Sequence, residues 1–169
     1  MNVLETERLT LRKLDSALDA EFIFELLNTP KFVRYIGDRG VRSADEASDF
    51  IEDRYRQSYR DHGYGLYVVE LKTDNTPVGL CGFVRRESLD SPDIGFAFLP
   101  GHEGKGYGFE SASGMMQYGR ETLGFTTVLA ITSLDNDASA RLLKKLEFTF
   151  DEIIDSGGEK LKLFSNKTA

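Results

Sequence analysis

The sequence predicts an α/β fold organised around a mixed β-sheet, and three observations support this prediction. Polar and apolar residues alternate in residues 9–12, and aromatic and β-branched residues dominate residues 64–71, as expected for strands. Apolar residues recur at helical spacing around Phe22 and again around Phe50. In the second half of the chain predicted strands and helices alternate, which implies parallel pairing there, whereas short turns elsewhere imply antiparallel hairpins.

Two helices are expected between the first strand and the second. Ser16 with Asp19 resembles an N-cap for the first helix, and the Asn-Thr-Pro sequence at residues 28–30 ends it. Ser43 begins the second helix, because Glu46 stands three residues later and completes a capping box. Each helix carries an apolar stripe that can face the sheet.

Further strands and helices follow in the rest of the chain. Residues 126–133 are apolar on both faces, which places this strand in the middle of the sheet. Turns at residues 74–75 and 156–158 join neighbouring strands into hairpins. The predicted strands cover residues 64–71, 78–84, 93–99, 126–133, 148–154 and 159–164, and the predicted helices cover residues 104–123 and 136–146.

Length and composition limit the class of protein. The 169 residues suit one domain, which we expect to span residues 1–169. A formal net charge of −7 disfavours general binding to nucleic acid. A lone cysteine, Cys81, excludes a disulfide framework, and two histidines without a spaced partner predict no metal site. No apolar run suits a membrane span or a signal peptide, so we expect a cytoplasmic protein without a membrane partner.

The most informative segment runs from a predicted strand through a glycine-rich loop into a helix. Gly104, Gly106 and Gly108 stand at every second position of this loop. Glycine accepts positive φ and lets the backbone approach a ligand closely. Backbone N–H groups at the start of a helix bind phosphate or diphosphate groups, and Lys105 adds a positive charge. The alternative interpretation is a flexible surface turn.

Two common nucleotide-binding loops do not fit this segment. A P-loop needs Ser or Thr directly after Gly-Lys, but Gly106 follows Gly104-Lys105 here. A dinucleotide-binding fingerprint needs a third glycine where Ser111 stands. The loop therefore belongs to another class of anion site.

The segment from Glu103 to Gly108 resembles the acyl-CoA pyrophosphate loop of the GNAT family of N-acetyltransferases. Residues 6–12, 94–96 and 136–148 resemble the opening strand, a later strand and the Asn-x-x-Ser helix of its ribosomal-protein N-acetyltransferase-like (RimJ/RimL-type) branch. The resemblance covers nearly the whole chain. It implies a GNAT-like, mostly antiparallel central sheet of about seven strands flanked by about four helices, with the fourth and fifth strands splayed apart.

The resemblance also implies roles for individual residues. Ser139 would give a proton to the leaving thiolate, and Asp93, where relatives often carry a carboxylate, would accept one from the amine. Apart from the resemblance, Glu70 is an alternative base, because it lies late in an otherwise apolar strand where burial would raise its pKa. Asn136 would contact the pantetheine arm, and it also suits a plain helix N-cap. Leu143 stands where many relatives carry a catalytic Tyr, and the ordinary Arg or Gln of the loop is Glu103 here. The residues expected to bind the cofactor are Phe98, Leu99, Glu103, Gly104, Lys105, Gly106, Tyr107, Gly108 and Asn136.

We therefore expect an acetyl-CoA-dependent N-acetyltransferase in which a primary amine attacks the thioester directly, without a metal. A protein N-terminal α-amine is favoured, because neutralising it near pH 7.4 costs roughly 1 kcal/mol, against roughly 4 kcal/mol for a lysine side chain. The alternatives are an acetyltransferase for a small-molecule amine and a catalytically silent acyl-CoA-binding module. The protein is expected to be a monomer or a homodimer.

Overall fold

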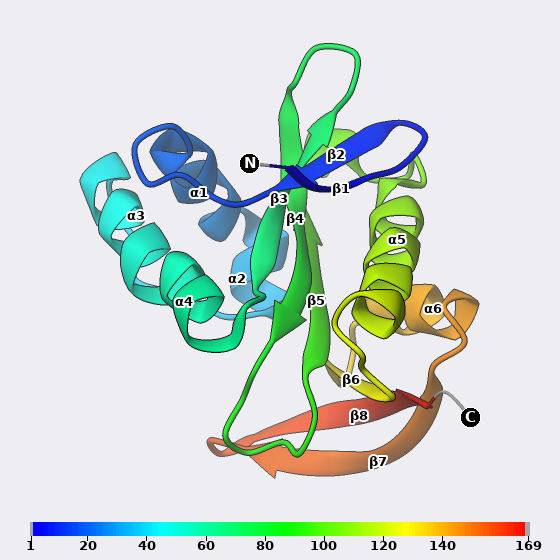
Figure 1. Ribbon diagram of the computed structural model, residues 1–169. Helices are drawn as coiled ribbons and strands as arrows, with labels where there is room; N and C mark the ends of the chain where they lie inside the picture. Colours follow the sequence, from blue (N-terminus) through cyan, green and yellow to red (C-terminus); the bar gives the residue numbers. More distant parts are fainter. Residues whose placement is uncertain (1, 168–169) are drawn as a thin grey trace.

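The computed structural model describes residues 2–167, which contain one eight-stranded sheet with helices on both faces (Figure 1). The strands lie in the order β1-β2-β3-β4-β5-β6-β8-β7. All neighbouring pairs are antiparallel except β5 and β6. The strands are β1 (Asn2–Glu5), β2 (Leu9–Arg12), β3 (Leu66–Leu71), β4 (Pro77–Val84), β5 (Asp93–Phe98), β6 (Thr127–Ser133), β7 (Thr149–Ser156) and β8 (Glu159–Lys167).

The helices form two layers. Figure 1 shows α1 to α4 on one side of the sheet and α5 and α6 on the other. The segments α3, η1 and α4 follow one another without a break, and η1 is a π-helical stretch within this long helix. The helical segments are α1 (Ala20–Leu27), α2 (Pro30–Tyr35), α3 (Ala44–Phe50), η1 (Ile51–Arg56), α4 (Gln57–His62), η2 (Pro100–His102), α5 (Tyr107–Glu121) and α6 (Asp137–Lys145).

The N-terminal region departs from the prediction in two short elements. β1 pairs with β2 and adds one strand to the predicted seven. Residues 28–30 end α1 as expected, but they also begin α2, because the Thr29 hydroxyl accepts a hydrogen bond from the Phe32 N–H and Pro30 fits the first helical position. The predicted cap at Ser16 is wrong. Asp19 precedes α1, and its carboxylate accepts hydrogen bonds from Arg12 instead of capping the helix.

In the second half of the chain, one predicted parallel pair of strands is confirmed and a second is wrong. β5 and β6 are parallel, as the strand–helix–strand pattern predicts. The second expected pair is absent from residues 2–167, because β8 inserts between β6 and β7 and is antiparallel to both. β8 buries Phe164 and Ser165, whereas β7 exposes most of its length and carries acidic residues. Such a charged strand suits the sheet edge, where it discourages pairing with other chains.

The predicted helix 104–123 begins three residues late, at Tyr107. Gly104 and Gly106 adopt φ values of +76° and +83°, which are incompatible with a right-handed helix. The glycines therefore form a loop that leads into α5 and do not belong to the helix itself.

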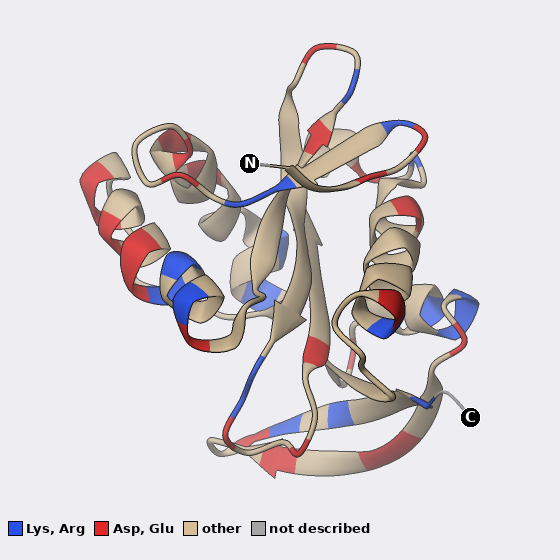
Figure 2. Cartoon of the chain, viewed as in Figure 1, with Lys and Arg blue, Asp and Glu red and all other residues tan. Residues whose placement is uncertain are grey.

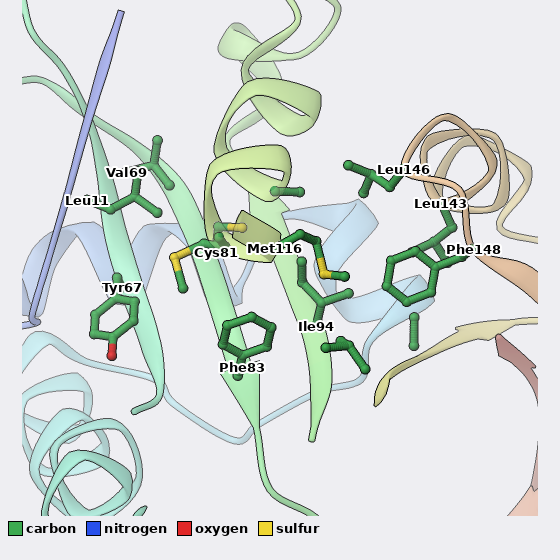
Figure 3. Packing of buried hydrophobic residues seen from close by; sticks show 14 of the residues in the cluster. Leu11, Tyr67, Val69, Cys81, Phe83, Ile94, Met116, Leu143, Leu146 and Phe148 are labelled. Carbon is green, nitrogen blue, oxygen red and sulfur yellow. The ribbon is translucent and has the colours of Figure 1, made fainter. Parts of the chain in front are cut away.

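Two apolar clusters hold the layers against the sheet. The larger one lies between the sheet and α5 and α6, where Phe83, Met116, Leu143 and Phe148 pack together (Figure 3). Cys81 belongs to this cluster, and burial raises the pKa of its thiol to about 12, which makes it an inert core residue. The second cluster lies under α1 to α3. An apolar cluster thus covers each face of the sheet.

The one parallel pair is also the weakest junction of the sheet. The pairing of β5 with β6 is confined to Asp93 opposite Leu129, with a hydrogen bond of 2.9 Å from the Leu129 N–H to the Pro92 carbonyl. Beyond this point the two strands part, as the family resemblance implies. We call this point of separation the β5–β6 fork.

Candidate functional site

The glycine-rich loop lies between the end of β5 and the start of α5. Gly106, in the left-handed conformation, is the N-cap residue of α5 and has no side chain that could bond to the first turn. The N–H groups of that first turn have no acceptor within the helix, and the dipole of this 15-residue helix concentrates positive potential there. The loop and helix therefore form an anion-binding geometry.

Gly108 has a packing role in addition to its place in the loop. A Cβ on Gly108 would lie 3.3 Å from Leu142 and 3.7 Å from the ring of Phe98. Glycine at this position lets α5 approach both α6 and β5. This close packing brings the N-terminal end of α5 near the end of β5.

Arg8 lies against this loop, although it comes from the turn between β1 and β2. Its Nη1 donates to the Lys105 carbonyl at 2.9 Å, and its Nε donates to Glu110 at 2.6 Å. The guanidinium carbon lies 4.7 Å from the centre of the Tyr107 ring. The sequence pattern gives no sign of this contact, because Arg8 belongs there only to the strand-like segment 6–12.

Glu103 is neutralised by a partner from the other layer of the molecule. Lys31, on α2, donates to the Glu103 carboxylate at 2.9 Å. A second ion pair joins α2 to the far side of the fork, where Arg34 donates to Asp135 at 3.0 Å. Since Glu103 follows β5 and Asp135 follows β6, α2 connects the segments that leave the two separated strands.

The elements next to the fork include basic ones. Figure 2 shows Lys and Arg on α2 and α6, and also on α4 and β8, whereas α1, α3 and β7 carry Asp and Glu. The net charge of −7 is therefore unevenly distributed.

Phe98 and Leu99 lie at the fork, but their backbone N–H groups point in opposite directions. The Leu99 N–H donates to the Val78 carbonyl of β4 at 2.9 Å. Because N–H groups alternate along a strand, the N–H of Phe98 points away from β4, toward β6. Gly79 makes room for Phe98, since a Cβ there would lie 2.5 Å from the Phe98 ring. Of these two residues, Phe98 directs its N–H into the fork.

The start of α6 brings the predicted Asn136 and Ser139 together. The Asn136 side-chain oxygen accepts a hydrogen bond of 3.2 Å from the Ser139 N–H, which makes Asn136 the N-cap of the helix. Its side-chain NH₂ remains available as a donor, and the Ser139 side chain is half-buried. Leu143, at the position of the family tyrosine, is 1% exposed and packs in the larger cluster.

Asp93 occupies the closed end of the fork. Its side chain is 1% exposed, and Arg86 Nε donates to it at 3.1 Å. Burial raises the pKa of Asp93 to about 6, although Arg86 opposes the shift. By strand alternation Asp93 shares its sheet face with Ala97 and Leu99, which pack under the α1–α3 layer.

The structure separates Glu70 from the fork. Glu70 lies on β3, with β4 between it and β5, and accepts a hydrogen bond of 2.7 Å from Arg12. Arg12 also binds both carboxylate oxygens of Asp19. This cluster ties β2, β3 and α1 together, so of the two candidate bases only Asp93 stands at the fork.

A surplus polar group lies near the open part of the fork. The Thr132 hydroxyl is buried and has no hydrogen-bond partner within residues 2–167. Buried hydroxyl groups are ordinarily paired, so an unpaired one at a ligand site is a candidate ligand contact.

Across residues 2–167, no group of three or more His, Cys, Asp and Glu could hold a metal ion. None of the helices described is long and apolar enough to cross a membrane.

The fold, the fork and the loop together define an acetyltransferase of the GNAT class. A family model described as an acetyltransferase (GNAT) domain matches residues 8–149. The chain therefore belongs to the GNAT acetyltransferase family, and the mixed sheet predicted from its sequence is confirmed.

The comparisons also identify individual relatives. The chain is 29% identical over 153 residues to the uncharacterized N-acetyltransferase YoaA of Bacillus subtilis (strain 168), which covers 90% of this chain and 85% of that protein. It is 28% identical over 149 residues to the uncharacterized N-acetyltransferase p20 of Bacillus licheniformis, which covers 88% of this chain and 83% of that protein.

Solved structures share the fold at lower identity. The RimL ribosomal L7/L12 alpha-N-protein acetyltransferase in complex with coenzyme A superposes with a TM-score of 0.83 at 17% identity, over 99% of this chain and 98% of that one. Spermidine N-acetyltransferase from Vibrio cholerae, in complex with CoA and spermine, gives a TM-score of 0.77 at 20% identity, over 95% of both chains. These two proteins act on different acceptors with one shared fold.

Proposed function

We propose that this protein transfers an acetyl group from acetyl-CoA to a primary amine, with the N-terminal α-amine of a protein as the favoured acceptor. The observation that carries the proposal is the placement of an anion-binding helix start directly beside the β5–β6 fork. A ligand with a diphosphate at one end and a slender arm at the other matches this arrangement. Acetyl-CoA has both parts.

The residues around the fork fit such a ligand. Gly104 leaves the loop before α5 open to a diphosphate, since no atom lies within 4 Å of a Cβ placed on it, and Gly106 lets the backbone pass close to Arg8. The unpaired hydroxyl of Thr132 and the side-chain NH₂ of Asn136 offer polar contacts to an arm in the fork. Glu103, Lys105, Tyr107 and Gly108 complete the proposed binding loop.

Three groups of the chain would then act on the reaction. Acetyl-CoA supplies the activated thioester. The N–H of Phe98 faces the fork and would stabilise charge that develops on the carbonyl oxygen. Ser139 would donate a proton to the departing sulfur. Asp93, five residues before Phe98 on β5, would accept the proton lost by the amine through bridging water. Asp93 comes from β5 and Ser139 from α6.

The pKa of Asp93 supports an α-amine acceptor. With a pKa of about 6, Asp93 is ionised at neutral pH and can accept a proton. Proton transfer from an α-amine to such a base is uphill by roughly 3 kcal/mol, whereas transfer from a lysine side chain is uphill by roughly 6 kcal/mol. The smaller free-energy cost of proton transfer favours protein N-termini and small amines of low pKa as acceptors.

Two measurements test the proposal. Acetyl-CoA should raise the melting temperature of the protein, and free thiol should accumulate when acetyl-CoA is mixed with a panel of peptides, polyamines and amino sugars. Turnover with peptides that have a free N-terminus, but not with N-terminally blocked peptides containing lysine, is the expected result. Turnover confined to small amines would change the acceptor class. Binding without turnover would favour the silent module, and no thermal shift at millimolar acetyl-CoA would overturn both.

A further inference from the structure

We infer that Arg8 binds the diphosphate of acyl-CoA and supplies the side-chain hydrogen-bond donor that this chain lacks at residue 103. The inference rests on the proposed function and deepens it, because it concerns the same loop. Arg8 is separated from Lys105 by almost 100 positions in the sequence, yet its guanidinium reaches the loop directly.

Three contacts fix the guanidinium against the loop. Nη1 donates to the Lys105 carbonyl, Nε donates to Glu110, and the group lies over the Tyr107 ring. Nη2 lies 3.2 Å from the position of a Cβ on Gly106. A side chain held in this way loses little freedom when a ligand binds, which favours tight binding.

Arg8 also keeps donors for a ligand. A guanidinium has five N–H groups, and the two hydrogen bonds of its side chain use two of them. The side chain is 45% exposed, so the other N–H groups can be reached from solvent. Arginine is well suited to phosphate oxygens because its planar fork of donors matches their spacing.

The charges around the loop point to an anion. A cation at the positive end of a helix is unfavourable unless an anion balances it. Glu110 provides one negative charge for Arg8, but Lys105 and the dipole of α5 remain. Glu103 contributes nothing to this balance, because it pairs with Lys31. The loop therefore has a positive excess in which Arg8 is the most firmly oriented donor.

The test compares the affinity of Arg8→Gln and wild-type protein for acetyl-CoA by calorimetry at rising KCl concentration. Arg8→Gln should weaken binding about 10- to 100-fold at low salt, as expected for lost charge-assisted hydrogen bonds. The difference should shrink at high salt, because ionic contacts are screened. Arg8→Lys should keep most of the salt dependence but only part of the affinity. Arg120→Gln, at the other end of α5, is the control for net charge and should bind like wild type.

Two results for Arg8→Gln would contradict a role of Arg8 in diphosphate binding. Equal affinity of Arg8→Gln and wild type would overturn the inference, and so would a loss that is the same at every salt concentration, since that pattern indicates a purely structural role. Thermal denaturation of each variant separates loss of fold from loss of binding. Failure of the wild type itself to bind acetyl-CoA would instead overturn the proposed function, and the inference with it.

Discussion

Lys31 Nζ lies 2.9 Å from Oε1 of Glu103, so the acidic residue of the loop is paired with a cationic side chain from α2. The two side chains are exposed, and such pairs contribute little to stability. Their effect is local: the pair removes the repulsion that a lone carboxylate would exert on a diphosphate. It also brings α2 to the entrance of the fork.

Glu103→Gln should therefore tighten acetyl-CoA binding slightly, by about two- to threefold at low salt, because Lys31 becomes free to attract the diphosphate. The gain should vanish at high salt. Calorimetric titration checks the prediction, with Glu159→Gln, an exposed residue of the β7–β8 hairpin, as the control for net charge. Weaker binding by Glu103→Gln would mean that Glu103 organises the loop.

Gly106→Val should abolish detectable acetyl-CoA binding at concentrations that saturate the wild type. A β-branched residue at φ +83° is strained, and its Cβ would lie 3.2 Å from Arg8. Unfolding should become easier by about 1–3 kcal/mol, which thermal denaturation measures. Gly101→Ala is the matched control, because a Cβ on Gly101 meets no atom within 4 Å and its φ is not positive. Intact binding by Gly106→Val would show that the diphosphate lies elsewhere.

The glycine loop was predictable because its signal is local. A strand, glycines at alternate positions and a helix occupy one short segment, and the spacing of Asn136 and Ser139 in α6 is equally local. The capping box at Ser43 is confirmed for the same reason, with Glu46 N–H donating to the Ser43 hydroxyl at 3.1 Å. In each case neighbouring residues determine the geometry.

The contacts that surround the loop could not be predicted in the same way. Arg8 and Lys31 reach the loop from elements about 100 and about 70 positions away. The sequence predicts both β7 and β8 as strands. That β8 lies between β6 and β7, and not at the sheet edge, depends on which of the two strands buries more apolar surface. Only the folded sheet brings these residues together, so sequence periodicity carries no signal for them.

Asp93→Asn should stabilise the protein at pH 7 while lowering its activity. Burial holds the pKa of Asp93 near 6, above its ordinary value near 4, so ionisation above pH 6 destabilises the folded state. The neutral amide removes this penalty, which amounts to about 2–3 kcal/mol. The benefit should decline as pH falls from 6 to 4 and disappear below that range, where Asp93 is protonated in both states.

Thermal denaturation of Asp93→Asn and wild type between pH 4 and pH 8 measures this dependence. A variant that is less stable at pH 7 would mean that the ion pair with Arg86 outweighs burial. If Asp93 is the base, turnover by the wild type should also rise with pH around 6, and this rise should be missing in Asp93→Asn.

Ser139→Ala should lower kcat by about 10- to 100-fold and leave the dissociation constant for acetyl-CoA within about twofold of wild type. The reason is that the hydroxyl is proposed to act on the departing sulfur, while the N–H that Asn136 caps belongs to the backbone and survives the substitution. Ser139→Thr keeps a hydroxyl and should restore part of the rate, whereas Ser113→Ala, an exposed position on α5, should behave like wild type. Stopped assays of free thiol give kcat, and calorimetry gives the affinity. A normal kcat for Ser139→Ala would remove Ser139 from the mechanism and leave water as the proton source.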